Sequence, residues 1–355
     1  MDRREMLKYL AGGMAATLLP AAWGACARQK GKVPLPAWTW YLAGKDRKKV
    51  EKDLALLSRY GFEGVHFQGD DETVAWAAGV ARRHGLRLHR WLITLLSRDE
   101  KVRKEHPDWF VVSRDGRSSL EHPPYVAYYT WLCPNREGVV NLLEERVRTS
   151  ARIPGVVGVH LDYIRYPDVI LPRGLWKKYG IVQDKEYPQY DFCYCEVCRG
   201  LFREAHGVDP LELPDPSSNP AWLQFRYDSI TKLVTRLKEV AKAEGRQLTA
   251  AVFPTPSIAR RLVRQQWERW PLDAVFPMIY HKFYEKEIPW IKEAVREGEE
   301  ALQGKFPLYA GLFIPAIEPG ELSEAVRYAR EGGARGVSLF RFAVMNEEHW
   351  KNFLT

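Results

Sequence analysis

The sequence contains no internal repeat beyond a recurring strand-and-helix unit, and it contains no low-complexity stretch. It also lacks an aromatic-laced basic tract, because its 53 lysines and arginines are scattered along stretches of helical pattern such as 46–61 and 230–245. This scatter indicates a solvated basic surface and argues against nucleic-acid binding, although the formal net charge is +8. Outside the cysteines there is no cluster of His and Asp with the spacing of an open metal site, which argues against a metal-dependent hydrolase such as a deacetylase.

The apolar stretch near the N-terminus, residues 9–23, is short for a membrane span. It follows an Arg3–Arg4 pair and precedes small residues around Cys26, an order that resembles a twin-arginine export signal. We therefore expect residues 1–29 to direct export to the periplasm or out of the cell. Alternatively, Cys26 is a lipid-modified first residue that anchors the mature chain to the bacterial envelope, and the two alternatives stay open.

Past this segment, short strand-like runs alternate with amphipathic helical stretches. The predicted strands lie at residues 35–42, 62–68, 86–93, 156–164, 248–254, 273–280, 307–313 and 335–341. The predicted helices lie near residues 46–60, 71–84, 136–152, 221–244, 258–269, 286–302, 320–332 and 346–354. Several helical stretches end at a glycine just before the next strand, and such short links favour parallel pairing through right-handed crossovers. Eight units of this kind most economically form one α/β domain, a (β/α)₈ TIM barrel over residues 30–355.

Two insertions interrupt this alternation, both on the strand-to-helix side. The first covers about residues 97–135 and predicts a small hairpin around Asp115 and Gly116. The second covers about residues 166–220 and contains a cysteine cluster. In a barrel the strand-to-helix loops build the catalytic face, so we expect these insertions to enlarge the rim of an active site.

The strand at 156–164 carries charge near its end. Because side chains alternate between the faces of a strand, the apolar residues at 157, 159 and 161 suit packing under helices, whereas His160 and Asp162 point into the barrel. Arg165 lies close enough to pair with Asp162 or to bind a substrate oxygen, and we expect this guanidinium to hold Asp162 ionised. The alternative is a buried Asp–Arg pair that only locks the end of the strand.

Aromatic and histidine side chains occur on or beside other strands of the predicted barrel. They are His66, Trp40, Trp91, Tyr280 and His281. Each one singly is more often a packing residue than a binding residue. Together with a carboxylate they suit a polyhydroxylated ligand, whose C–H faces stack on rings while its hydroxyls need fixed polar partners.

Three segments carry a resemblance to a known family: "VHLDYIRYP" at 159–167, "HPDWFV" at 106–111 and "AVFPTP" at 251–256. They resemble bacterial family-10-like glycosyl hydrolases, which are secreted TIM barrels, and the resemblance covers most of residues 35–345. It implies a glycan-directed enzyme that cleaves glycosidic bonds of an oligo- or polysaccharide, with Asp162 as a catalytic carboxylate. Substrate-binding roles for Arg165, His160 and the aromatic and histidine set agree with that expectation.

Glycoside hydrolysis generally needs a second carboxyl group. The predicted strands at 248–254 and 273–280 end without an acid, so we expect the partner among Asp70 or Asp71, Glu285 and Glu318. By default each of these is a surface or helix-capping acid. The gap leaves open a second hypothesis, a carbohydrate-binding TIM barrel that does not cut.

Apart from Cys26, the sequence has four cysteines: Cys133 in the first insertion, and Cys193, Cys195 and Cys198 in the second. Three thiolates spaced C-x-C-x-x-C can wrap one face of a tetrahedral zinc, with Cys133 as the fourth ligand. The pattern resembles the structural zinc cluster of family-42 β-galactosidases. We expect a closed, structural zinc site that joins the two insertions; after export, two disulfides are the alternative. No organic cofactor is expected.

Overall fold

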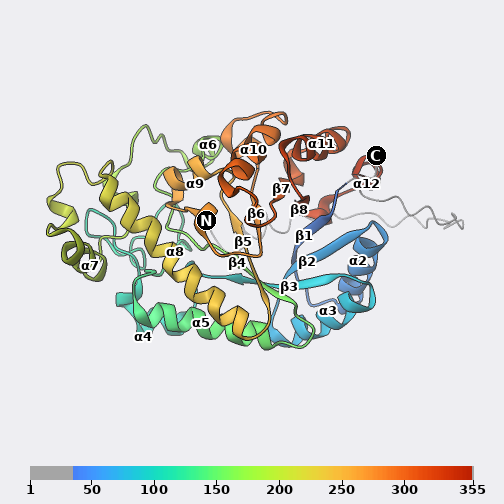
Figure 1. Ribbon diagram of the computed structural model, residues 1–355, viewed down its shortest axis with the longest axis horizontal. Helices are drawn as coiled ribbons and strands as arrows, with labels where there is room; N and C mark the ends of the chain where they lie inside the picture. Colours follow the sequence, from blue (N-terminus) through green and yellow to red (C-terminus); the bar gives the residue numbers. More distant parts are fainter. Residues whose placement is uncertain (1–34, 354–355) are drawn as a thin grey trace, which may run out of the picture.

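The computed structural model describes residues 35–353, so the expected export signal and Cys26 lie outside the described residues. Eight parallel strands form a nearly closed barrel in the order β6-β5-β4-β3-β2-β1-β8-β7 (Figure 1). Isolated bridges join β6 to β7, from Val275 to Leu308 and from Met278 to Gly311. The strands are β1 (Ala37–Leu42), β2 (Phe62–Gln68), β3 (Arg87–Ile93), β4 (Gly158–Asp162), β5 (Gln247–Val252), β6 (Ala274–Pro277), β7 (Tyr309–Phe313) and β8 (Gly336–Phe340). The predicted TIM-barrel fold is confirmed.

Helices alternate with the strands and cover the barrel. They are α2 (Arg47–Arg59), α3 (Asp71–Arg83), α5 (Glu137–Arg152), α8 (Pro220–Ala243), α9 (Pro256–Val263), α10 (Trp290–Leu302), α11 (Leu322–Gly332) and α12 (Glu347–Phe353). Side-chain caps define several starts: Asp46 accepts from the amide of Lys49, and Asp70 accepts from the amide of Thr73. Gly61, between α2 and β2, has a φ of 78°, a conformation that favours glycine at a helix exit.

The structure corrects two predicted boundaries. The helix predicted at 258–269 ends at Val263, because Arg264 adopts a left-handed conformation with φ of 56°. The strand predicted at 273–280 ends at Pro277, because the amides of Ile279 and Tyr280 turn back to the carbonyls two residues earlier. Both differences are local turns that hydrophobic periodicity does not encode.

The barrel interior is filled by a cluster of large aromatic side chains and two alanines. Its buried members are Trp38, Trp40, Trp91, Ala251, Ala274, Phe276 and Tyr309. On β4, Val159 and Leu161 instead belong to the main hydrophobic core together with residues of the surrounding helices. The predicted alternation of β4 is therefore confirmed, and it turns Asp162 toward the inside of the barrel.

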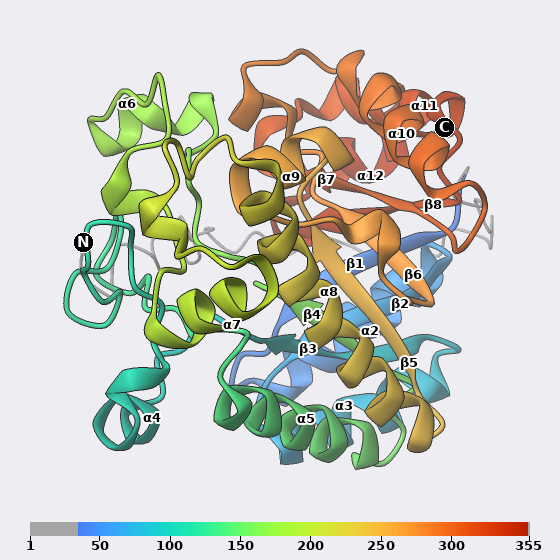
Figure 2. The same cartoon turned by 60° about the vertical axis from the view of Figure 1, so that its left-hand side comes forward.

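The two insertions lie together on one side of the barrel, where the short helices α4 (Glu100–Glu105), α6 (Trp176–Tyr179) and α7 (Glu196–His206) are found (Figure 2). The expected hairpin is present as a tight turn in which Val112 pairs with Ser118 and Gly116 has a φ of 86°. An antiparallel bridge from Ser113 to Phe192 joins this turn to the second insertion. Within residues 35–353, no helix combines the length and the apolar character that a membrane crossing requires.

Candidate active site

A cavity of about 690 Å³ opens at the carboxyl ends of the strands, where the two insertions meet the barrel. Both insertions contribute to its wall, which confirms that they enlarge the rim of the pocket. Aromatic side chains make up much of the wall: Trp40, Trp91, Tyr125, Tyr128, Tyr129, Tyr163, Tyr179, Phe253, Tyr280, Phe283, Tyr284, Phe313 and Phe340. Such a surface suits stacking against the C–H faces of sugar rings.

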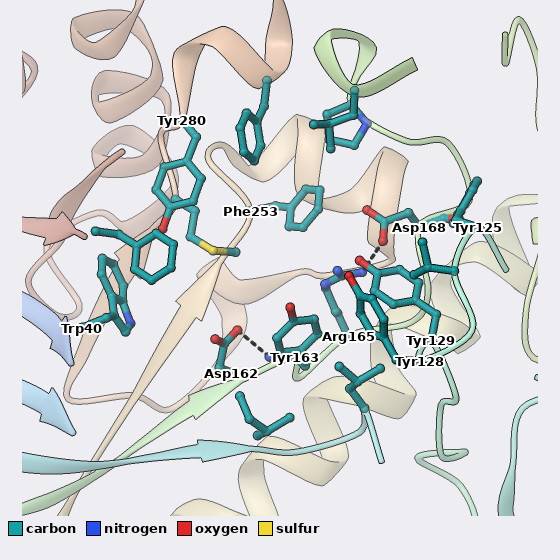
Figure 3. Close-up of a pocket in the computed structure, with 18 of the residues that line it drawn as sticks. Trp40, Tyr125, Tyr128, Tyr129, Asp162, Tyr163, Arg165, Asp168, Phe253 and Tyr280 are labelled. Carbon is teal, nitrogen blue, oxygen red and sulfur yellow. Dashed lines mark hydrogen bonds and ion pairs between the residues drawn. The ribbon is translucent and has the colours of Figure 1, made fainter. Parts of the chain in front are cut away.

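Asp162, the last residue of β4, lies in this pocket with 8% of its surface exposed. Its Oδ2 accepts a hydrogen bond from Trp91 Nε1 at 2.9 Å, and its Oδ1 accepts one from the Tyr163 amide at 2.7 Å (Figure 3). Tyr163 has a φ of 55°, a conformation that non-glycine residues adopt mainly at constrained, often functional, positions. Burial raises the pKa of the Asp162 carboxyl despite the opposing effects of the two donors and Arg165, so this group keeps its proton to a higher pH than an exposed aspartate does.

Arg165 pairs with a different carboxylate from the one expected. Its Nη1 lies 2.9 Å from Asp168 Oδ2 and donates to the Tyr166 carbonyl at 2.9 Å (Figure 3). Arg165 and Asp168 are both buried and both line the pocket. The expectation that Arg165 holds Asp162 ionised is therefore wrong: the chain turns after Tyr163, and burial outweighs the attraction of the guanidinium.

Asp168 is the pocket carboxylate that sequence reasoning missed. It lies 2% exposed, beside the aromatic side chains Tyr125, Tyr128 and Tyr129, across Arg165 from Asp162 (Figure 3). The available signal was the Arg-x-x-Asp spacing of residues 165–168, directly after the motif that drew attention to Asp162.

Three of the aromatic residues predicted to bind substrate reach the pocket. Trp40, Trp91 and Tyr280 line it, and Trp40 and Tyr280 lie on the side of Asp162 opposite to Asp168 (Figure 3). Trp40 also donates a hydrogen bond from Nε1 to His160 Nε2 at 2.9 Å, so it connects the pocket to the barrel interior.

The three predicted histidines do not line the pocket. His160 accepts from Trp40 and has Nδ1 2.9 Å from the Thr249 hydroxyl, and its ring stacks on His66 with centroids 3.6 Å apart. Burial lowers the pKa of both rings well below the usual value, so they are neutral core groups. His281 is buried as well, in the turn after β6. His66 and His160 lie two residues earlier on their strands than Gln68 and Asp162, which line the pocket, so they lie deeper in the barrel than the cavity.

None of the acids expected to partner Asp162 lines the pocket. Asp70 caps α3, and Asp71 lies 3.5 Å from Arg90. Glu285 is exposed and pairs with Arg173 at 3.5 Å, and Glu318 takes part in a capping box with Glu321. Each occupies the surface or capping position that is the default for such acids. Among the described residues, the acids in the pocket wall are Asp99, Asp162 and Asp168.

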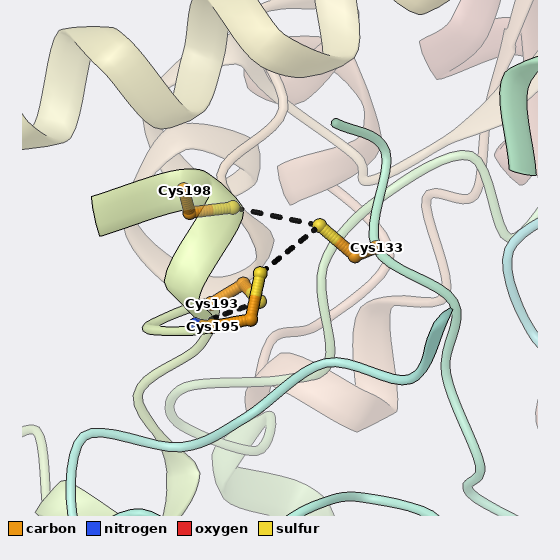
Figure 4. Close-up of side chains that lie close together, drawn as sticks. All are labelled: Cys133, Cys193, Cys195 and Cys198. Atoms are coloured by element: carbon orange, nitrogen blue, oxygen red, sulfur yellow. Dashed lines mark hydrogen bonds between the residues drawn. The ribbon is translucent and has the colours of Figure 1, made fainter. Parts of the chain in front are cut away.

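The cysteines of the two insertions meet in a buried cluster (Figure 4). Their four sulfurs lie within 4.8 Å of one another, and Cys133 Sγ is 3.7 Å from Cys195 Sγ and 3.4 Å from Cys198 Sγ. Both distances exceed the length of a disulfide bond, about 2 Å. They are close to the spacing of about 3.8 Å between the corners of a tetrahedral zinc–sulfur site. The donor set can therefore hold a metal ion, and it would leave no open coordination position.

No known protein family matches the chain, and no curated protein is similar to it in sequence. Solved structures share its fold. The glycoside hydrolase domain of PgaB (BpsB) from Bordetella bronchiseptica has a TM-score of 0.64 at 11% identity, over 90% of this chain and 98% of that one. A β-galactosidase from the psychrophilic Marinomonas ef1 has a TM-score of 0.63 at 12% identity, over 90% of this chain and 58% of that one. Gan42B, a family-42 β-galactosidase from G. stearothermophilus, has a TM-score of 0.56 at 12% identity, over 88% of this chain and 51% of that one. The chain thus has the TIM-barrel fold of glycoside hydrolase domains.

Proposed function

We propose that the protein is a glycoside hydrolase of the family-10-like type, with Asp162 as its general acid. The observation that carries the proposal is a buried carboxyl group with a raised pKa, at the end of a barrel strand, in an aromatic pocket. A general acid must hold its proton near the working pH, and burial is the usual way to achieve this for a carboxyl group. The motif residues Asp162, Tyr163 and Arg165 all line the pocket, which supports the family assignment.

Asp168 is the proposed second carboxylate. It lines the same pocket as Asp162, and its Oδ2 is held 2.9 Å from Arg165 Nη1. It would supply the second carboxyl group that glycoside hydrolysis generally needs, as nucleophile or base. Asp99 is a poorer candidate, because it caps α4 and pairs with Arg146 at 3.0 Å.

The ion pair of Asp168 also favours a second candidate function. A carboxylate engaged by Arg165 is less available for attack, and a barrel with only Asp162 available would bind a carbohydrate without cleaving it. The two candidate functions can be distinguished, because a glycoside hydrolase releases new reducing ends from its glycan and a binding barrel does not.

The test is to screen the purified chain and its Asp162→Asn variant against a panel of glycans for reducing ends. We expect cleavage of one glycan, reduced about 10²- to 10⁴-fold in the variant, the usual contribution of a general acid. The melting temperature of the variant is measured as a check on folding, because asparagine keeps the size of the side chain but can accept only one of the two hydrogen bonds that Asp162 accepts. Equal cleavage by both proteins would overturn the role of Asp162, and binding without cleavage would favour the second candidate.

We also propose that Cys133, Cys193, Cys195 and Cys198 hold a structural zinc ion, and that residues 1–29 direct export, with or without lipid attachment at Cys26. The all-sulfur donor set supports zinc as the metal. The twin arginines and the short apolar stretch support export.

A further inference from the structure

A second cavity, of about 400 Å³, is separate from the candidate active site and reaches the cysteine cluster. Cys195 is the member of the cluster that lines this cavity. The exposed fraction of Cys195 is 4%, whereas Cys133, Cys193 and Cys198 are fully buried. The cavity therefore gives small molecules from solvent access to the cluster at the sulfur of Cys195.

Cys195 also occupies a position that favours reaction of its sulfur. It is the N-cap residue of α7, where the partial positive charge of the helix end stabilises a thiolate. Arg136 lines the same cavity and lies 3.1 Å from Glu196, the next residue of the chain. Burial alone would lower the pKa of Arg136, but the charge of Cys195 and the contact with Glu196 raise it, so this guanidinium attracts the Cys195 thiolate. Accessible thiolates beside positive charge are the ones that oxidants attack.

A second sulfur lies where it can react with an oxidised Cys195. Cys133 Sγ, from the first insertion, is 3.7 Å from Cys195 Sγ, and the two sulfurs point toward each other (Figure 4). A relative shift of under about 2 Å would bring them to the length of a disulfide bond. Such a bond would connect the first insertion to the second, as a metal ion held by the four cysteines would.

We propose that Cys195 is an oxidation site for hydroperoxides, and that Cys133 converts the oxidised thiol into a disulfide that replaces the metal in joining the two insertions. The inference rests on the proposed metal site. In the first step the Cys195 thiolate attacks one oxygen of hydrogen peroxide, the O–O bond breaks and hydroxide leaves. The sulfur is oxidised to a sulfenic acid and the peroxide is reduced.

In the second step the Cys133 thiolate attacks the sulfenic sulfur, the S–S bond forms and a second hydroxide leaves. Two of the four sulfur ligands are lost in this step, so the metal is released. Zinc and a disulfide, the two alternatives that the cysteine pattern leaves open, then become two redox states of one cluster. The two insertions stay joined in both states.

The experiment treats the full chain, reduced and loaded with zinc, with hydrogen peroxide. A chromogenic chelator follows the release of zinc, and mass spectrometry locates disulfides and, in a parallel sample, sulfenic acid trapped with dimedone. We expect severalfold more dimedone on Cys195 than on any other cysteine, a disulfide from Cys133 to Cys195, and loss of about one zinc per chain. The oxidised, zinc-free protein should melt at a higher temperature than the reduced, zinc-free protein, because the disulfide restricts the unfolded chain.

Arg136→Gln should slow the modification of Cys195 severalfold, because it removes the cation that attracts the thiolate. Arg199→Gln is the matched control, because Arg199 lines the same cavity but its Nε and Nη2 are held by Asp209 at 2.7–3.0 Å. Dimedone on another cysteine before Cys195, zinc release without the bond from Cys133 to Cys195, or equal rates in the two variants would overturn the proposal. A reduced chain that takes up no zinc would remove the metal site, and peroxide treatment of that chain would still decide whether Cys195 and Cys133 pair.

Discussion

At the residue scale, Asp162 is held by two donors that oppose the effect of its burial. Burial raises the pKa of the carboxyl group, whereas the Tyr163 amide and the Trp91 indole N–H favour the carboxylate. Because Trp91 contacts the carboxylate through a single hydrogen bond of 2.9 Å, it can be altered without changing the acid itself. Trp91 is thus a positioning residue whose effect appears in the dependence of activity on pH.

Trp91→Phe should move the alkaline limb of the pH–activity profile upward. Removing the donor destabilises the carboxylate, so the pKa of Asp162 rises and the acid keeps its proton to higher pH. One hydrogen bond to a charged group corresponds to roughly one pH unit. Trp109→Phe, which changes an indole outside the pocket wall, is the control. A limb that stays in place, or moves downward, would contradict the role of Asp162 as the acid.

Several residues of the site could be predicted from the sequence, because strand parity and position are local properties. Strand parity correctly predicted that Asp162 points into the pocket. It also led to the wrong prediction that His66 and His160 line the site, because parity gives the direction of a side chain and not its depth in the barrel. Asp168 was missed because its position depends on how the chain turns after Tyr163, whose φ of 55° has no sequence signature. The same turn explains why Arg165 was assigned to the wrong carboxylate.

At the element scale, the second insertion is tied to the barrel by a buried ion-pair network. Asp191, fully buried, pairs with Arg226 of α8 and lies 3.7 Å from Arg264, which follows α9. Burial alone would raise the pKa of Asp191, but Arg226 and Arg264 outweigh burial and lower it. The insertion that forms one wall of the pocket therefore depends on a charge at neutral pH.

Asp191→Asn should destabilise the protein by about 3–5 kcal/mol at neutral pH, because it leaves the buried Arg226 without its counter-charge. Since the folded-state pKa is lowered, the contribution of the carboxylate is present above the usual Asp pKa and is lost as pH falls through the folded value. The stability difference between variant and wild type should thus shrink below roughly pH 4. Urea unfolding at several pH values measures it, with the exposed Asp184→Asn as control. A difference that does not change with pH would contradict the assignment.

The cysteine cluster connects the two insertions, in addition to the bridge from Ser113 to Phe192. It joins Cys133 to the cysteines at the start of α7. We expect about one zinc per chain by elemental analysis, as the Cys₄ donor set holds a single ion. Cys195→Ser should lose the metal and lower the melting temperature, whereas Val197→Ala, next to Cys198 and two positions after Cys195, should keep the metal. A wild type with neither metal nor free thiols would instead indicate disulfides.

The order and type of the main elements could be predicted because hydrophobic periodicity and the glycines at helix ends are properties of short stretches of sequence. The extents of α9 and β6 could not, since Arg264 and the turn after Pro277 end them against the hydrophobic pattern. The meeting of the two insertions was predictable only through the cysteines. The ion-pair network around Asp191 joins residues far apart in the sequence, and no local pattern marks it.

At the scale of the whole molecule, the strands of the barrel are not hydrogen-bonded equally all the way around. Paired ladders join neighbouring strands except between β6 and β7, where isolated bridges close the sheet. At this seam the amide of Ile279 donates to the Gly311 carbonyl at 2.9 Å. A Cβ atom at Gly311 would lie 2.6 Å from the Pro277 carbonyl oxygen, so the strands approach closely only because residue 311 is glycine.

Gly311→Ala should therefore force the seam apart and lower stability by about 1–3 kcal/mol, the usual cost of overpacking. Gly79→Ala is the control, because nothing lies within 4 Å of its Cβ and alanine is favoured by about 0.5–1 kcal/mol over glycine inside a helix. Thermal unfolding of both variants measures the contrast. A Gly311→Ala variant as stable as the wild type would show that the seam can relax.

The fold as a whole could be predicted because eight consecutive strand-and-helix units most simply form a closed (β/α)₈ barrel. Its seam could not, since the hydrophobic pattern of β6 and β7 resembles that of the other strands. The expected export signal concerns residues 1–29, outside the described residues, and stays a prediction.

The contact between the two insertions at the cysteine cluster also has a consequence for the order in which the molecule folds. Cys133 and Cys195 are 62 positions apart, with α5 and β4 between them. Contacts between distant parts of a chain form late, because a long loop must first be closed. The pairing of β1 with β8 joins residues that are 300 positions apart, as in the hydrogen bond from Thr39 to Leu339, so by the same argument the two insertions can meet before the barrel closes.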